Sequence, residues 1–212
     1  PPYKTTTYSM SPPPPREEGF KYRVPGNALV VGPSSSGKSV YAFRLLRDGL
    51  IEPRPERIVW CYTQWQPLYE TMREQLPQVV FVKGIPYDIT DDNYFDARQC
   101  NALILDDFLE ESKRDKRISR LFTQTSHHKN VLIFLLLQNL FPRGSECRDI
   151  ALNAHYVTLF HSPIDKQQIK LFARGIFPEN LEHFMSKYQQ VAETPYGQLT
   201  LDLKPTTKDK IG

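Results

Sequence analysis

The sequence predicts an α/β protein built on a mainly parallel β-sheet that is flanked by helices. Apolar segments of strand length alternate with helical segments along most of the chain. Several of these segments are apolar throughout, which is typical of strands covered on both faces. The longest, Val131–Leu137, has the length of a buried strand, because a membrane-spanning helix needs about 20 apolar residues. We therefore expect no membrane-spanning segment.

The elements follow one another in a regular order. Strands are expected at Asn27–Val31, Arg57–Tyr62, Val79–Val82, Ala102–Leu105, Val131–Leu137 and His155–Phe160. Helices are expected at Lys38–Asp48, Leu68–Gln75, Ser112–Ser126, Lys166–Ala173 and Asn180–Gln190. In the first helix, apolar residues are spaced for one face and Gly49 stands at the stop position. A turn signal at Pro195-Tyr196-Gly197, followed by Gln198–Leu203, predicts a C-terminal β-hairpin.

Length and composition indicate one globular domain. The chain has 212 residues, of which 40% are hydrophobic and 24% charged, enough for a sizeable core. Residues 1–19 are rich in Pro, Thr and Ser and predict a flexible arm. We assign residues 20–205 to the domain and 206–212 to a polar tail. The chain does not begin with Met, so its native start is left open.

Net charge and cysteine usage exclude little. The formal net charge of +3 permits nucleic-acid binding without arguing for it. Cys61, Cys100 and Cys147 form no CxxC pair, so neither a zinc site nor a disulfide framework is indicated. A reducing compartment is the simplest interpretation.

The segment after the first strand matches the phosphate-loop pattern G-x-x-x-x-G-K-[ST]. Backbone N–H groups of such a loop, and the start of the helix that follows, surround phosphate oxygens. The pattern predicts that Lys38 reaches the β and γ phosphates of ATP and that the Ser39 hydroxyl coordinates Mg²⁺. A glycine-rich turn without nucleotide is the alternative. The nucleotide-binding residues would be Gly32, Pro33, Ser34, Ser35, Ser36, Gly37, Lys38 and Ser39.

Two acids follow the strand Ala102–Leu105. In a parallel sheet, ligands bind outside the carboxyl ends of the strands, so these acids should lie beside the phosphate loop. We expect Asp106 to hold Mg²⁺ and Asp107 to be the general base that activates water. Glu110 or Glu111 is the alternative base. Without the phosphate loop, the same pattern would only indicate a strand that runs into a turn.

Gln138 follows the most hydrophobic strand directly. Its amide could orient water against the γ phosphate, although a polar residue that merely ends a strand explains the pattern equally well.

Two further clusters of polar residues carry weaker signals. The basic cluster, defined by Lys113, Arg114, Lys116, Arg117 and Arg120 with Lys129 close after it, is most simply a solvated helix face. A contact to the DNA backbone or an arginine finger is the alternative. His127-His128 suggests a metal site only weakly, because adjacent side chains diverge and no third ligand is indicated.

Four blocks of sequence resemble viral genome-packaging ATPases of the FtsK/HerA superfamily. Their closest likeness is to the poxvirus-type enzymes of polintons and adintovirus-like viruses, and the first two blocks are more specific than the phosphate loop. The blocks are Leu121–Phe141, Arg148–Phe160, Asp165–Ile169 and Pro195–Pro205.

The resemblance implies a RecA-like core acting as a homo-oligomeric ring, a pentamer or hexamer, that threads double-stranded DNA into a preformed capsid. Capsid or portal-vertex proteins would be its partners. The protein would work inside the infected cell, at a nuclear or cytoplasmic assembly site, or with the virion. Gln138 becomes the sensor glutamine, and Arg148 is placed to face a neighbour's nucleotide, with Arg120, Arg143 and Arg174 as competitors. Ile164 departs from the family pattern, which has a basic residue there.

Two other functions fit the phosphate loop. A helicase or other DNA translocase would use the same ATP chemistry. A nucleoside or nucleotide kinase fits the size, although such kinases more often show an Arg-rich lid over the acceptor. ATP turnover with and without long double-stranded DNA separates these hypotheses.

Overall fold

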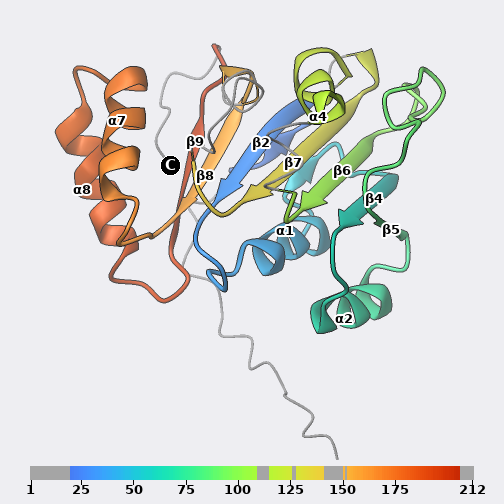
Figure 1. Ribbon diagram of the computed structural model, residues 1–212, viewed down its shortest axis with the longest axis horizontal. Helices are drawn as coiled ribbons and strands as arrows, with labels where there is room; N and C mark the ends of the chain where they lie inside the picture. The colour runs from blue at the N-terminus through green and yellow to red at the C-terminus, as the bar shows by residue number, and fades with distance from the viewer. Residues whose placement is uncertain (1–19, 109–114, 126–127, 141–149, 151, 206–212) are drawn as a thin grey trace, which may run out of the picture.

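A seven-stranded β-sheet forms the middle layer of the part of the chain that the structure describes (Figure 1). The computed structural model describes residues 20–108, 115–125, 128–140, 150 and 152–205. The strand order is β5-β4-β6-β7-β2-β8-β9, and neighbouring strands are parallel except for β8 and β9. The strands are β2 (Gly26–Val31), β4 (Arg57–Tyr62), β5 (Val79–Lys83), β6 (Asn101–Asp106), β7 (Val131–Leu137), β8 (Tyr156–Phe160) and β9 (Gln198–Asp202).

Every residue of β2, β6 and β7 is buried, as their continuous apolar sequences predict. Successive side chains along each strand enter opposite faces, so the sheet separates two cores. Along β2, for example, Ala28 and Val30 belong to one core, and Leu29 and Val31 belong to the other. The expected mainly parallel sheet, covered on both faces, is confirmed.

The helices divide between the two cores. On one face, α1 (Lys38–Arg47) and α2 (Pro67–Gln75) contribute to the core that contains Trp60. On the other face lie α4 (Lys116–Arg120), α7 (Lys166–Ile176) and α8 (Leu181–Val191), with buried side chains such as Phe184. Figure 1 shows α7 and α8 side by side at the β9 end of the sheet.

The C-terminal antiparallel pair differs from the expected hairpin in its connection. β9 pairs with β8, with Phe160 opposite Gln198, but α7 and α8 lie between them in the sequence. The turn at Pro195-Tyr196-Gly197 joins α8 to β9 instead of joining two strands. A turn signal marks where the chain reverses, and it does not say which kinds of element it connects.

Two smaller features differ from expectation. A two-stranded parallel sheet of β1 (Tyr22–Arg23) and β3 (Ile51–Glu52) is too short to leave a pattern in the sequence. The helix expected at Ser112–Ser126 is, in its described part, α4 followed by a π-helix, η1 (Leu121–Thr125). The N-terminal arm, residues 1–19, and the polar tail, residues 206–212, lie outside the described residues.

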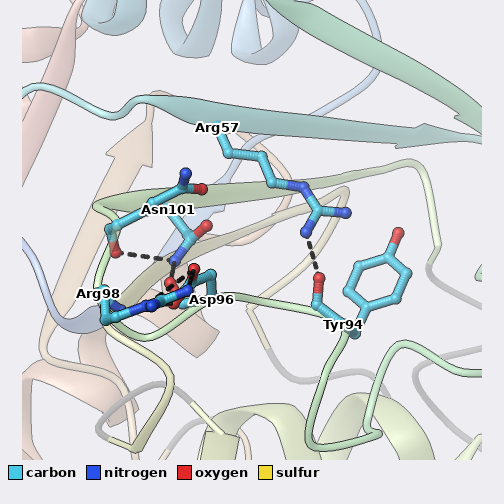
Figure 2. Close-up of polar contacts among 6 residues, drawn as sticks. Arg57, Tyr94, Asp96, Arg98 and Asn101 are labelled. Atoms are coloured by element: carbon cyan, nitrogen blue, oxygen red, sulfur yellow. Dashed lines mark hydrogen bonds and ion pairs between the residues drawn. The ribbon is translucent and has the colours of Figure 1, made fainter.

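A polar network holds the loop before β6 at the amino end of the sheet (Figure 2). The Asn101 side-chain amide donates to the carbonyl oxygens of Asp96, at 2.9 Å, and Gln99, at 3.0 Å. From β4, Arg57 donates to the carbonyl of Tyr94 and lies over that ring, 5.1 Å from its centroid. These contacts fix the amino ends of β4 and β6, and Asp106 lies at the opposite, carboxyl end of β6.

Candidate nucleotide site

The phosphate loop connects the carboxyl end of β2 to the first turn of α1. Gly32 continues the β2 strand, and its N–H donates to the carbonyl of Leu137 on β7 at 3.1 Å. Gly37 precedes α1 with φ of 96°, a left-handed conformation that glycine adopts without strain. No side chain caps the helix, which leaves its first N–H groups directed at the loop. This is the strand–loop–helix context that the motif requires.

Lys38 closes the loop. Its ammonium donates to the carbonyl oxygens of Gly32, at 2.7 Å, and Pro33, at 2.8 Å. Burial lowers the pKa of Lys38, while the nearby carboxylates of Asp106 and Asp107 oppose that shift. A cation in such surroundings gains from an additional anion, because partial desolvation strengthens the attraction.

The backbone at Gly32 leaves no room for a side chain. A methyl group on Gly32 would lie 2.6 Å from Cβ of Phe160 and 2.7 Å from Oγ of Ser36. Within the described residues, that buried Ser36 oxygen has no hydrogen-bond partner. A buried hydroxyl normally has one, so Ser36 is poised to donate to an oxygen that enters the loop. The residues present therefore fit a bound phosphate group.

Asp106 ends β6 and is only 3% exposed. Its carboxylate is hydrogen-bonded by the Ser39 hydroxyl and by the Tyr69 hydroxyl, the latter at 2.9 Å. Burial raises the pKa of Asp106, and these two donors and Lys38 partly offset the shift. The structure thus brings Ser39 and Asp106 together as expected. A hydroxyl and a carboxylate are the hard oxygen ligands that suit Mg²⁺.

Asp107 and Gln138 meet at the same edge of the sheet. The Gln138 amide donates to the Asp107 carboxylate at 3.1 Å, although the two residues follow different strands. Asp107 is exposed and has φ of 66°, in the sparsely populated left-handed region. Such conformations cluster at functional sites, where the surrounding structure maintains them. Sequence reasoning named each residue separately, and the structure adds their contact.

Tyr69 was missed by sequence reasoning. It lies on α2, is fully buried, and belongs to an aromatic cluster with Trp60, Trp65 and Phe81. Burial, first of all, and the neighbouring Asp106 raise the pKa of Tyr69, so its hydroxyl stays a donor. Its place beside Asp106 depends on β4 pairing with β6, and no local pattern reveals that pairing. A tyrosine among apolar helix residues was the only available signal.

Other expected site residues divide between the described chain and the rest. Arg148, its competitor Arg143, the alternative bases Glu110 and Glu111, and Lys113, Arg114 and His127 lie outside the described residues. His128 is exposed, and the described residues hold no cluster of three or more His, Cys, Asp or Glu that could bind a metal.

Two members of the basic cluster are held by other contacts. Arg117 donates to Asp115, at 2.6 Å, and to the carbonyl of Pro86, at 3.0 Å. Lys129 binds Asp92 at 2.8 Å. Lys116 and Arg120 are exposed on α4. The described part of the cluster therefore offers fewer free cations than its sequence suggests.

Comparisons with solved structures place this site in a known fold. The DNA-packaging ATPase B204 from Sulfolobus turreted icosahedral virus matches with a TM-score of 0.57 and 16% identity, over 84% of this chain and 93% of that one. The chain shares its fold with viral genome-packaging NTPases. The expected RecA-like P-loop fold class is therefore confirmed. No protein-family model matches the chain, and no curated protein matches it.

Complexes of a second virus protein show what that neighbour binds. B204 from Sulfolobus turreted icosahedral virus 2, in complex with AMP, matches with a TM-score of 0.55 and 17% identity, over 88% of this chain and 96% of that one. Its complex with ATP-γS matches with a TM-score of 0.56 and 14% identity over the same shares.

In the described part of this chain, no helix has the length and apolar character needed to cross a membrane.

Proposed function

We propose that the protein is an ATPase whose site is formed by the phosphate loop Gly32–Ser39, Asp106, Asp107 and Gln138. The observation that supports this most directly is that the residues of the site meet at one edge of the sheet. Three neighbouring strands, β6, β7 and β2, deliver an acid pair, an amide and a phosphate loop to one edge of the sheet. The fold shared with genome-packaging NTPases supports the same assignment.

The residues divide the work of hydrolysis among them. Lys38 turns from the loop carbonyls to the β and γ phosphates, where its charge offsets the charge that builds in the transition state. Asp107 accepts a proton from the attacking water, and the Gln138 amide fixes the orientation of that carboxylate. Ser39 and Asp106 would hold Mg²⁺, which supplies electrostatic stabilisation of the phosphate oxygens. Glu110 and Glu111 remain alternatives to Asp107 as the base.

We further propose that this ATPase drives double-stranded DNA into a preformed viral capsid, as a poxvirus-type member of the FtsK/HerA superfamily. The four sequence blocks and the fold of B204 support this proposal. A homo-oligomeric ring, pentameric or hexameric, would work with capsid or portal-vertex proteins at an intracellular assembly site. In such a ring, Arg148 would stabilise the γ phosphate bound by a neighbouring subunit.

The test is ATP turnover with and without long double-stranded DNA. Wild-type protein should hydrolyse ATP, and DNA should raise the rate. Lys38→Ala should lower turnover by about a hundredfold or more, because a preorganised charge at the transition state is lost. Lys170→Ala, which removes an exposed lysine from α7, is the matched control and should retain activity.

Three outcomes would contradict the proposal at different levels. Turnover by Lys38→Ala within about threefold of wild type would show that the nucleotide site is misassigned, because such a loss is under 1 kcal/mol. A turnover rate that DNA does not change would argue against DNA translocation, and the ATPase assignment would still stand. Phosphoryl transfer to a nucleoside monophosphate would identify a kinase.

A further inference from the structure

The strand order gives a direction to a nucleotide bound in the phosphate loop; this inference rests on the proposed function. Asp107 and Gln138, the groups suited to the γ phosphate, follow β6 and β7. Both strands lie on one side of β2, and β8 and β9 lie on the other. A triphosphate is an extended chain, so its nucleoside must leave the loop on the side away from the γ phosphate. The nucleoside therefore points toward the ends of β8 and β9.

Two aromatic rings stand on that side of the loop. Phe160 ends β8, and Tyr196 lies in the turn that precedes β9. A methyl group added to Gly37 would lie 3.4 Å from Cδ1 of Tyr196 and 3.9 Å from Cε1 of Phe160. The segment between α8 and β9 thus reaches the same end of the sheet as the phosphate loop (Figure 1). Phe160 is 3% exposed and belongs to the core, whereas Tyr196 is 65% exposed.

The turn fixes the backbone of Tyr196 and leaves its ring exposed. Tyr196 has φ of 58°, a left-handed conformation that costs a residue with a Cβ about 1 kcal/mol or more. The following residue, Gly197, donates to the carbonyl of Thr194 at 2.9 Å. A methyl group on Gly197 would lie 2.4 Å from the carbonyl oxygen of Val191, so the backbone is packed against the end of α8. An exposed aromatic ring therefore stands on a packed turn beside the phosphate loop.

We propose that Tyr196 contacts the nucleoside of the bound nucleotide and stacks on its base. Aromatic side chains with one exposed face bind bases in this way, and every base offers a π face. Stacking reads no hydrogen-bonding edge of the base, so the contribution of Tyr196 extends to nucleotides of any base. The phosphate loop holds the triphosphate, and Tyr196 holds the nucleoside end.

Calorimetric titration of the full chain with Mg·ATP and with Mg·tripolyphosphate tests the proposal. Tripolyphosphate shares the phosphates and lacks the nucleoside. Tyr196→Ala should weaken ATP binding by about five- to a hundredfold, as loss of one stacked base predicts. Its affinity for tripolyphosphate should stay within about twofold of wild type. Tyr196→Phe keeps the ring and should bind ATP like wild type. Tyr87→Ala removes an 87% exposed tyrosine from another loop and should change neither affinity.

Tyr196→Gly is a second variant, because glycine removes the ring and also relieves the strained φ. It should match Tyr196→Ala in ATP affinity, and its Tm should be at least as high as that of Tyr196→Ala. Equal weakening of ATP and tripolyphosphate would show that the ring only supports the loop, and unchanged ATP binding would show that it makes no nucleoside contact. Wild-type protein that binds neither titrant would instead refute the nucleotide site itself.

Discussion

Asp106 is the residue on which most of the site depends. It is nearly fully buried, yet it must be ionised to bind a divalent cation. Two hydroxyl donors, from Ser39 and Tyr69, stabilise the carboxylate against the cost of burial. In the proposed site, Tyr69 would position Asp106 and favour its charged form.

Tyr69→Phe should lower the apparent affinity for Mg²⁺ more than it lowers the maximal rate of hydrolysis. The ring still fills the aromatic cluster, but the carboxylate loses a donor. We expect the Mg²⁺ concentration for half-maximal ATPase to rise about tenfold, because a hydrogen bond to a charged group contributes roughly 1.5–3 kcal/mol. A donor favours the charged form, so its loss raises the pKa of Asp106 further and moves the acidic limb of the pH–rate profile upward.

Tyr22→Phe is the matched control for this change. Tyr22 is also fully buried, and its hydroxyl bonds to Thr158 at 2.6 Å, away from the carboxylates. It should lower thermal stability and leave both the Mg²⁺ dependence and the pH profile unchanged. If the two variants behaved alike, the Tyr69 hydroxyl would be structural only.

Asp106→Asn should stabilise the nucleotide-free protein. Because burial raises the pKa of Asp106, the folded chain binds this proton more tightly than the unfolded chain. Its contribution to stability is full below the unfolded pKa of about 3.9 and is lost as pH rises through the folded value. At neutral pH the charge is thus a net cost, and Asn removes it while keeping an oxygen that accepts from Tyr69.

Thermal unfolding against pH measures this effect. Tm should rise by about 2–4 °C for each kcal/mol regained, and the advantage should shrink as pH falls toward 4. Asp107→Asn is the control: that side chain is exposed, so its replacement should move Tm little while it abolishes hydrolysis. A lower Tm for Asp106→Asn at neutral pH would mean that the carboxylate stabilises the resting fold.

At the scale of elements, the sequence pattern predicted the strands and helices that depend only on residues close together in the chain. The apolar strands β2, β4, β6 and β7, and the helix α1 after the phosphate loop, lie where their sequences place them, within a few residues. The contact between Asp107 and Gln138 could not be predicted from either segment alone, because it depends on β6 and β7 being neighbours in the sheet. Tyr69 could not be found, since its partner lies on another strand and its own helix shows only that the ring is buried.

The π-helix and the C-terminal turn mark a second limit of sequence reasoning. α4 and η1 read as one helix, because the difference between α and π hydrogen bonding involves single residues. Likewise, Pro195-Tyr196-Gly197 is a turn in any context. Its value to the site arises from β9 pairing antiparallel with β8, which brings the turn to the carboxyl edge.

The two exposed cations of α4 give a prediction about DNA. Lys116 and Arg120 are exposed, whereas the guanidinium of Arg117 is held by Asp115 and a carbonyl. If the cluster tracks phosphates, the double variant Lys116→Gln, Arg120→Gln should flatten the dependence of log affinity on log salt by up to about 1.8, or roughly 0.9 for each contact. Fluorescence anisotropy with duplex DNA at several salt concentrations measures that slope.

Arg117→Gln separates charge from structure in the same experiment. It should leave the salt slope unchanged and lower thermal stability, because Asp115 and the carbonyl of Pro86 lose their donor. An unchanged slope in the double variant would show that Lys116 and Arg120 do not contact DNA phosphates and only form a solvated helix face.

At the scale of the whole molecule, the proposed ring makes hydrolysis a property of two subunits. Subunits with Arg148→Ala should bind ATP normally and hydrolyse it poorly. Subunits with Asp107→Asn should also be inactive alone. Mixing the two should restore part of the activity, because an intact Arg148 can then face an intact Asp107. A mixture as inactive as its parts, while wild-type turnover depends on assembly, would exclude Arg148 as the residue acting between subunits.

The place of β2 at the heart of the sheet also has a consequence for how the chain folds. β2 lies near the start of the sequence, but its two neighbours, β7 and β8, come more than 95 residues later. During synthesis this apolar strand therefore has both edges unpaired until most of the chain has been made. Non-local parallel pairing of this kind slows folding and exposes intermediates to aggregation. We expect the phosphate loop, which is anchored to β2, to be among the last parts to acquire its native shape.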